Sequence, residues 1–196
     1  MIGFNMDVKT QMEILEKIIL SNKLLYNVFI KAKDLKLINY YIGAGCIAQT
    51  VWNYQMGFEP LNGISDIDLV YYDDKDLSLE SENDKIEYIK NTIDTSPIKL
   101  DIKNQARVHL WYNEHFGYDI KPYISVENAI NTWPTTSTSI GIRIEAQNLK
   151  IYAPFGLNDL LGMIVRANKA QITEEIYNQK VNKWIKKWPT LKIIPW

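Results

Sequence analysis

Two aspartates separated by one residue constrain this chain more than any other feature. Asp66 and Asp68 begin an apolar stretch at residues 69–72 that has the composition of a strand. In a strand, side chains at positions i and i+2 point to the same face, so the two carboxylates project together. Two such charges repel, and a divalent cation relieves the repulsion. Because hard oxygen ligands suit Mg²⁺ or Mn²⁺, the pair predicts a metal site on the face of a sheet.

A glycine-bearing turn precedes the aspartates by about twenty residues. Gly43-Ala-Gly45-Cys46 follows a strand predicted at residues 40–42 and leads into a helix predicted at residues 46–56. A strand–turn–helix unit of this kind offers backbone N–H groups to a phosphate, so we expect Gly43, Gly45 and Cys46 to contact a nucleotide. The alternative is a tight turn that needs glycine only for its backbone angles. The turn lacks the third glycine of a Rossmann fingerprint, so it is not one. It also lacks the Gly-Lys-Ser/Thr end of a P-loop, which excludes that motif.

A third carboxylate, Asp101, lies on the next predicted strand, at residues 98–103. A two-metal site needs a third acidic ligand, and we expect Asp101 to supply it. The alternative is an exposed carboxylate paired with a neighbouring lysine. Lys103 and Arg107 follow, and we expect both to bind triphosphate oxygens, with Arg107 using its bidentate fork. For Lys103 the alternative is a solvated side chain at a helix start.

Charge and cysteine content limit the function classes. The 22 basic and 23 acidic side chains leave a net charge of -1, so no DNA partner is predicted and an RNA contact would need a local patch. The lysines of residues 180–187 could form that patch. The single cysteine excludes an internal disulfide and a cysteine-rich zinc site. The sequence has neither a signal-peptide pattern nor a long apolar run, which predicts a cytoplasmic protein without a membrane partner.

The order of predicted elements indicates an α+β protein of α/β-like character with one main sheet. Helical spacing over residues 7–33 predicts one or two helices, with a break and an N-cap at Ser21-Asn22. No Gly/Ser/Pro-rich linker interrupts the chain, so we predict a single domain over residues 1–196. Its catalytic half would span about 1–120, with a packed-on half at about 121–196. Further helices are predicted at residues 77–93, 106–116, 125–133, 154–165 and 173–187, and a hairpin at residues 138–145 and 149–153, around Gln147-Asn148.

Several short segments between residues 43 and 160 resemble the polymerase-β-like nucleotidyltransferase superfamily. More narrowly, they resemble a compact bacterial nucleotidyltransferase family of about this length. The resemblance spans roughly residues 40–190, and residues 104–111 are its most family-specific part. It implies a mixed sheet flanked by helices, with Asp66 and Asp68 as the metal pair and Gly45-Cys46 near the incoming triphosphate. A serine usually stands where this chain has Cys46. Because a thiol is a weaker donor than a hydroxyl, the backbone would carry the phosphate contact. The segments concerned are residues 43–46, 49–53, 66–73, 76–78, 103–112, 133–134 and 153–160.

The resemblance implies a metal-dependent nucleotidyl transfer. An acceptor hydroxyl would attack the α-phosphorus of an NTP, ATP among the candidates, and pyrophosphate would leave. Asp66 and Asp68 would hold two Mg²⁺ or Mn²⁺ ions, and Asp101 would bind the second ion and accept the hydroxyl proton. The acceptor is left open between a tRNA or other RNA end, a small molecule and a protein. Two alternatives are a catalytically inactive protein that binds a nucleotide or a protein partner, and a component of a toxin–antitoxin pair.

Overall fold

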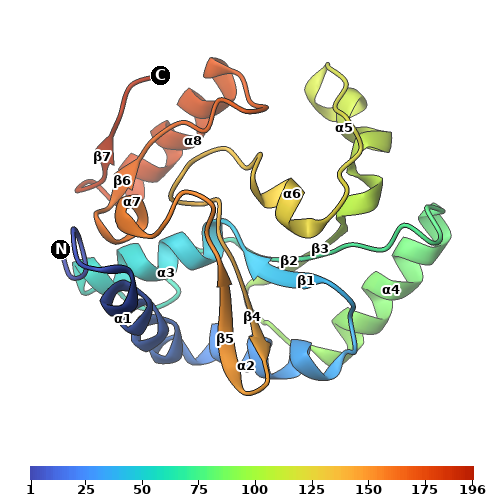
Figure 1. Ribbon diagram of the computed structural model, residues 1–196, viewed down its shortest axis with the longest axis horizontal. Helices are drawn as coiled ribbons and strands as arrows, with labels where there is room; N and C mark the ends of the chain where they lie inside the picture. Colours follow the sequence, from blue (N-terminus) through green and yellow to red (C-terminus); the bar gives the residue numbers. More distant parts are fainter.

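A five-stranded mixed sheet forms the centre of the computed structural model, which describes residues 1–196 (Figure 1). The strand order is β3-β2-β1-β4-β5. Strands β2 and β3 run parallel, and the other neighbouring pairs run antiparallel. The mixed sheet with flanking helices confirms the predicted α+β class. The strands are β1 (Tyr40–Gly43), β2 (Asp66–Tyr71), β3 (Lys99–Asn104), β4 (Gly141–Glu145) and β5 (Asn148–Tyr152).

The helices cover both faces of this sheet, and a second, two-stranded sheet lies near the C-terminus. None of the helices combines the length and the apolar character that crossing a membrane requires. The helices are α1 (Val8–Ser21), α2 (Lys23–Asp34), α3 (Gly45–Met56), α4 (Leu79–Thr92), α5 (Val108–Phe116), α6 (Val126–Ile130), α7 (Asn158–Leu161) and α8 (Glu174–Lys187), with a 3₁₀ turn η1 (Gln105–Arg107); the small sheet pairs β6 (Ile164–Val165) with β7 (Lys192–Ile193).

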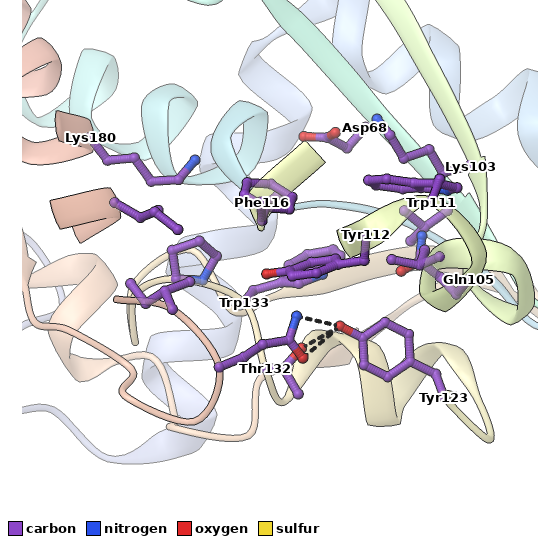
Figure 2. Close-up of a pocket in the computed structure, with 17 residues that line it drawn as sticks. Asp68, Lys103, Gln105, Trp111, Tyr112, Phe116, Tyr123, Thr132, Trp133 and Lys180 are labelled. Carbon is purple, nitrogen blue, oxygen red and sulfur yellow. Dashed lines mark hydrogen bonds between the residues drawn. The ribbon is translucent and has the colours of Figure 1, made fainter. Parts of the chain in front are cut away.

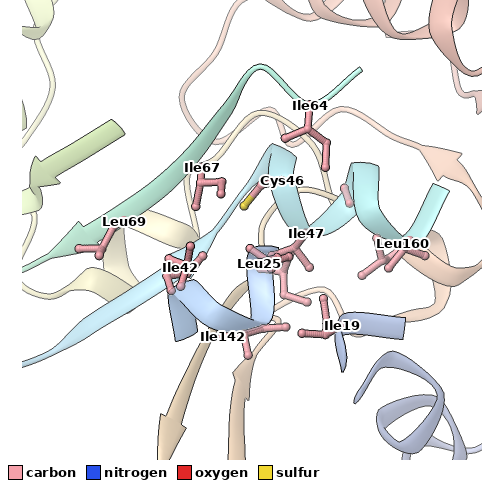
Figure 3. Close-up of a cluster of buried hydrophobic side chains, with 14 of the residues drawn as sticks. Ile19, Leu25, Ile42, Cys46, Ile47, Ile64, Ile67, Leu69, Ile142 and Leu160 are labelled. Carbon is pink, nitrogen blue, oxygen red and sulfur yellow. The ribbon is translucent and has the colours of Figure 1, made fainter. Parts of the chain in front are cut away.

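Alternation along β1 and β2 divides the sheet into two unlike faces. Ile42 and Leu69 point into the large core that the sheet shares with α1, α2 and α3 (Figure 3). Tyr41 and Val70, one position along each strand, point to the opposite face and pack against Ile130 of α6. Successive strand residues alternate between faces, so the residues that share a face with Val70 lie on the α6 side.

Most predicted helix boundaries are confirmed by their caps. The Asn22 side chain accepts a hydrogen bond from the Leu25 backbone N–H at 3.2 Å, so it starts α2 at the predicted break. Ser78 and Ser125 cap α4 and α6 in the same way. Helix α3 ends at Gly57, whose φ of 67° suits a residue without a side chain.

The C-terminal half departs from the prediction at one helix end, at two unpredicted strands and at one hairpin turn. The helix predicted to end near residue 165 stops at Leu161, because Met163 adopts a φ of 53° and the chain then enters β6. Strands β6 and β7 have two residues each and pair across the sequence, so local periodicity could not reveal them. The hairpin turns at Ala146-Gln147, where both residues have positive φ, one position before the predicted turn.

Candidate active site

A pocket of about 290 Å³ lies on the α6 side of the sheet, with walls from α5 and α8 (Figure 2). Strands β2 and β3 contribute Asp68 and Lys103, helix α5 contributes Trp111, and helix α8 contributes Lys180. Trp133, between α6 and β4, closes another side. These residues come from distant parts of the sequence, and the fold brings them around one cavity.

Asp68 lies at the junction of three strands. It pairs in register with Gly43 of β1 and with Asp101 of β3, and Asp66 shares its face two residues earlier. Neither Asp66 nor Asp68 forms an ion pair. Burial raises the pKa of Asp68 to about 7, and the charges of Asp66 and Asp101 add to the shift although Lys103 and Lys180 oppose it. The nearby lysines therefore offset the negative charge at Asp68 only in part.

Asp101 differs from Asp68 in its partners. Its carboxylate pairs with Lys103 and, at 3.4 Å, with the Lys99 ammonium. Burial alone would raise its pKa, but the hydrogen bond and charge of Lys103, aided by Lys99, hold the pKa of Asp101 below its usual range. Lysine pairing was the alternative that the sequence left open. Asp101 is thus the register neighbour of Asp68, with its charge already balanced.

The acidic pair fits a divalent cation in its donor chemistry. Asp66 and Asp68 offer hard carboxylate oxygens from one strand face, and no cationic side chain pairs with either of them. No group of three or more histidine, cysteine, aspartate or glutamate side chains is arranged to hold a metal ion. A cation at this pair would therefore need further oxygen ligands, from a neighbouring carboxylate, a substrate or water.

The glycine turn has the geometry of a close backbone approach. Ala44 adopts φ 60° and ψ -132°, a region that favours glycine, and its N–H donates to the Ile140 carbonyl at 3.0 Å. Helix α3 starts without a side-chain cap. Its first backbone N–H groups consequently lack partners inside the helix, and Ala44 lines the pocket just before them.

Gly43 and Cys46 each have a packing role in this turn. A Cβ on Gly43 would lie 2.3 Å from the Ile140 carbonyl oxygen and 3.0 Å from the Trp133 ring. The Cys46 thiol is buried and lies 3.0 Å from the Gly43 carbonyl oxygen, to which it donates. Burial and the nearby Asp68 charge raise the pKa of Cys46 above its usual range. The thiol therefore points into the protein, and Ala44 is the residue of the turn that lines the pocket.

Arg107 lies outside the pocket, contrary to its predicted contact with a triphosphate. Its guanidinium pairs with Glu82 of α4, and its Nε donates to the Leu77 carbonyl at 2.9 Å. Both side chains of the ion pair are 9% exposed. Because Glu82 also accepts from the Asn104 backbone N–H at 2.8 Å, Arg107 fastens the end of β3 to α4. Lys103, by contrast, does line the pocket.

Lys180 is a site residue that sequence reasoning missed. The sequence placed it in a basic surface patch, whereas the structure turns its ammonium toward Asp68 across the pocket (Figure 2). It has no hydrogen bond or ion pair. Burial lowers its pKa, and the Asp68 charge opposes that shift. Periodicity along α8 could mark Lys180 as neighbouring Tyr177, but only the docking of α8 reveals what it faces.

Comparisons with known proteins agree with this geometry. Residues 31–193 match the profile of a protein family described as nucleotidyltransferase. No curated protein matches the chain. A solved structure, described with the words "The NMR structure of the protein reveals a CCA-adding enzyme head domain", superposes with a TM-score of 0.75 at 21% sequence identity. The match covers 97% of each chain, so the two share a fold over nearly their whole length.

Proposed function

The chain belongs to the nucleotidyltransferase family, and we propose that it transfers a nucleoside monophosphate from an NTP to an acceptor hydroxyl. One observation carries the proposal: Asp68, which shares its strand face with Asp66, lines a pocket that also holds the unpaired ammonium of Lys180, and neither aspartate forms an ion pair. Anionic ligands for a metal and a cation for phosphate are the two requirements of such a transfer.

We assign Asp66 and Asp68 to a divalent cation, Mg²⁺ or Mn²⁺. When bound, the ion supplies Lewis-acid stabilisation of the charge on the phosphates. The raised pKa of Asp68 supports this assignment, because the same uncompensated charge that favours a proton favours a divalent cation. Asp101 is the proposed third carboxylate. Since Lys103 and Lys99 hold its pKa low, it would act as an ionised ligand more readily than as a strong base.

The triphosphate would be held by two groups of donors. Lys180 lacks a partner within the protein, so a phosphate oxygen can take its ammonium without breaking an ion pair. The first backbone N–H groups of α3, after Ala44, offer a second contact at a helix N-terminus. In the transfer, the acceptor oxygen bonds to the α-phosphorus and the bond to the pyrophosphate oxygen breaks. The electron pair leaves with pyrophosphate, and the hydroxyl proton passes to a carboxylate or to solvent.

We propose an RNA end as the acceptor. The exposed lysines Lys183, Lys186 and Lys187 continue along α8 from Lys180, which gives the backbone of a nucleic acid a cationic path to the pocket. The similar solved structure is described as a CCA-adding enzyme head domain, which agrees with this class of acceptor. Transfer of label to RNA that weakens steeply between low and moderate salt would support the proposal. Label found only on a small molecule or a protein would overturn it.

Substitution of the acidic pair tests the transfer itself. Asp66→Asn and Asp68→Asn should abolish the Mg²⁺-dependent transfer of label from an α-labelled NTP into any component of a cell extract. Asp84→Asn, at an exposed aspartate of α4, is the matched control and should retain full transfer. Circular dichroism would establish that each variant is folded. Undiminished transfer by either Asp66→Asn or Asp68→Asn would refute the assignment.

A further inference from the structure

We infer that the aromatic end of the pocket binds an adenine base and that the Gln105 side-chain amide recognises it. The inference rests on the proposed function, because the base would belong to the NTP whose phosphates lie toward Asp68. It adds the class of nucleotide and a specificity-determining residue to that proposal.

The pocket has a charged end and an aromatic end. Lys180, Asp68 and Lys103 lie along the upper side of the view in Figure 2, and the rings of Tyr112 and Trp133 lie below them. Stacking of a base on an aromatic side chain contributes about 1–3 kcal/mol. A volume of about 290 Å³ is near the lower limit for sites that bury a small organic ligand. The dimensions therefore suit one nucleoside with its phosphates directed at Asp68.

The wall opposite the charged end is held by hydrogen bonds among its own residues. The Tyr123 hydroxyl lies 2.9 Å from the Thr132 Oγ1 and 3.0 Å from the Gln171 Oε1. The Tyr118 hydroxyl donates to the Gln171 backbone carbonyl at 2.9 Å. Because these groups satisfy one another, they shape the pocket and are poor candidates for reading a base.

Gln105 differs from these residues because its side-chain amide has no such partner. It is 4% exposed, it lines the pocket, and its amide forms no hydrogen bond within the protein. Solvent in the pocket still reaches this amide, because it is not one of the fully buried polar groups without a partner. A ligand can therefore take the place of water at the amide. Figure 2 shows Gln105 beneath Trp111, on the aromatic side. A base stacked at this end would present its edge to the amide.

The chemistry of the amide selects among bases. A glutamine side chain donates and accepts side by side, which matches the amino group and adjacent ring nitrogen of adenine. The two acceptors on the corresponding edge of guanine suit Arg or Lys, and both lysines of the pocket lie at its Asp68 end. Cytosine offers the same pair in its amino group and N3, so stacking must separate it from adenine, and a pyrimidine offers the smaller ring. Adenine satisfies both the amide and the aromatic surface.

Nucleoside binding without metal or phosphate tests the inference on the wild-type protein. Titration of adenosine, purine riboside, guanosine and uridine would be followed by calorimetry. We expect adenosine to bind about fivefold to tenfold more tightly than purine riboside. Purine riboside lacks the amino group, so its complex would lose one hydrogen bond to the amide. Guanosine and uridine should bind more weakly than adenosine. Equal affinity for adenosine and purine riboside, or tighter binding of guanosine or uridine, would overturn the inference.

The variant Gln105→Leu removes the amide at nearly constant volume. It should bind adenosine and purine riboside equally well, and its stability should match or exceed that of the wild type because the amide it loses has no partner. Gln179→Leu is the matched control, since Gln179 is exposed on α8 away from the pocket, and it should keep the preference for adenosine. A preference that persists in Gln105→Leu would exclude Gln105 as the recognition residue.

The outcome separates this inference from the proposed transfer. Selective adenosine binding without any nucleotidyl transfer would leave the adenine site standing and remove the proposed activity. Transfer from GTP or UTP at the rate seen with ATP, without nucleoside selectivity, would support the proposed activity and remove the adenine site.

Discussion

At the scale of single residues, neighbours decide which carboxylates and cations are available for chemistry. Asp68 and Asp101 are register partners on adjacent strands, yet the pKa of Asp68 is raised to about 7 and that of Asp101 is lowered. Burial acts on both. Lys103 and Lys99 pair with Asp101 alone, and this difference reverses the sign of the net shift. The site thereby keeps one uncompensated carboxylate beside one that is already neutralised.

The first prediction concerns Asp68 and pH. Its folded pKa of about 7 lies above its usual value, so the folded metal-free protein holds a proton that the unfolded chain has lost. The stability associated with this proton is present below about pH 4 and is lost as pH rises toward about 7. We expect the melting temperature of wild type without divalent cation to fall over this window more steeply than that of Asp68→Asn.

Added Mg²⁺ provides the control for that measurement. At pH 7.5 it should raise the melting temperature of the wild type and leave that of Asp68→Asn nearly unchanged, because binding to the folded state stabilises it. Parallel pH profiles for the two proteins would contradict the prediction.

The second prediction concerns Lys180. Replacing it with methionine keeps the length of the side chain and removes the ammonium that faces Asp68. A hydrogen bond to a charged group is worth about 1.5–3 kcal/mol, so the KM for the NTP should rise by roughly tenfold to a hundredfold. Steady-state kinetics would measure the change. Lys183→Met, one turn along α8 and exposed, is the control and should keep the KM within about twofold of the wild-type value. An unchanged KM in Lys180→Met would exclude the phosphate contact.

At the scale of elements, buried polar pairs fix helices to the sheet and so determine where site residues point. Arg107 and Glu82 join η1 to α4, and Glu82 also receives the last backbone N–H of β3. This contact orients α5, which carries the aromatic wall of the pocket. The arginine that sequence reasoning assigned to a triphosphate is used for this internal connection.

The third prediction follows from that ion pair. Arg107→Ala leaves the Glu82 carboxylate buried without its partner, which should lower the free energy of unfolding by about 3–5 kcal/mol. The double variant Arg107→Met with Glu82→Leu should recover much of the loss. Urea denaturation would measure both. A stable Arg107→Ala protein with a large rise in KM for the NTP would instead favour the contact predicted from sequence.

At the scale of the whole molecule, the C-terminal helix is docked onto the N-terminal half by tryptophans. Trp52 of α3 contacts Trp188 edge to face, with ring centroids 5.3 Å apart. The Trp188 indole N–H donates to the Asn53 side chain at 2.7 Å, and both groups are buried. Figure 1 shows α8 and α5 on opposite sides of α6. The docking of α8 is what carries Lys180 to Asp68.

The fourth prediction tests this docking. Trp188→Phe keeps an aromatic ring but leaves the buried Asn53 oxygen with only a long hydrogen bond, 3.4 Å from the Asn62 side-chain amide. This loss should cost about 1–3 kcal/mol of stability. Trp196→Phe, at a half-buried tryptophan whose indole forms no hydrogen bond, is the control and should cost less. Chemical denaturation would compare the two. Equal losses would indicate that the hydrogen bond to Asn53 has little part in docking α8.

Local patterns determined most of the elements and the acidic pair. The two-residue strand period puts Asp66 and Asp68 on one face whatever surrounds them, and the caps at Asn22, Ser78 and Ser125 act within three residues of their own positions. The tertiary structure alone decided which groups meet: Lys103 neutralises Asp101, Arg107 pairs with Glu82, and Lys180 faces Asp68 without an ion pair. Such partners depend on which segments pack together. That outcome is governed by burial and desolvation summed over the whole fold, which no local spacing encodes.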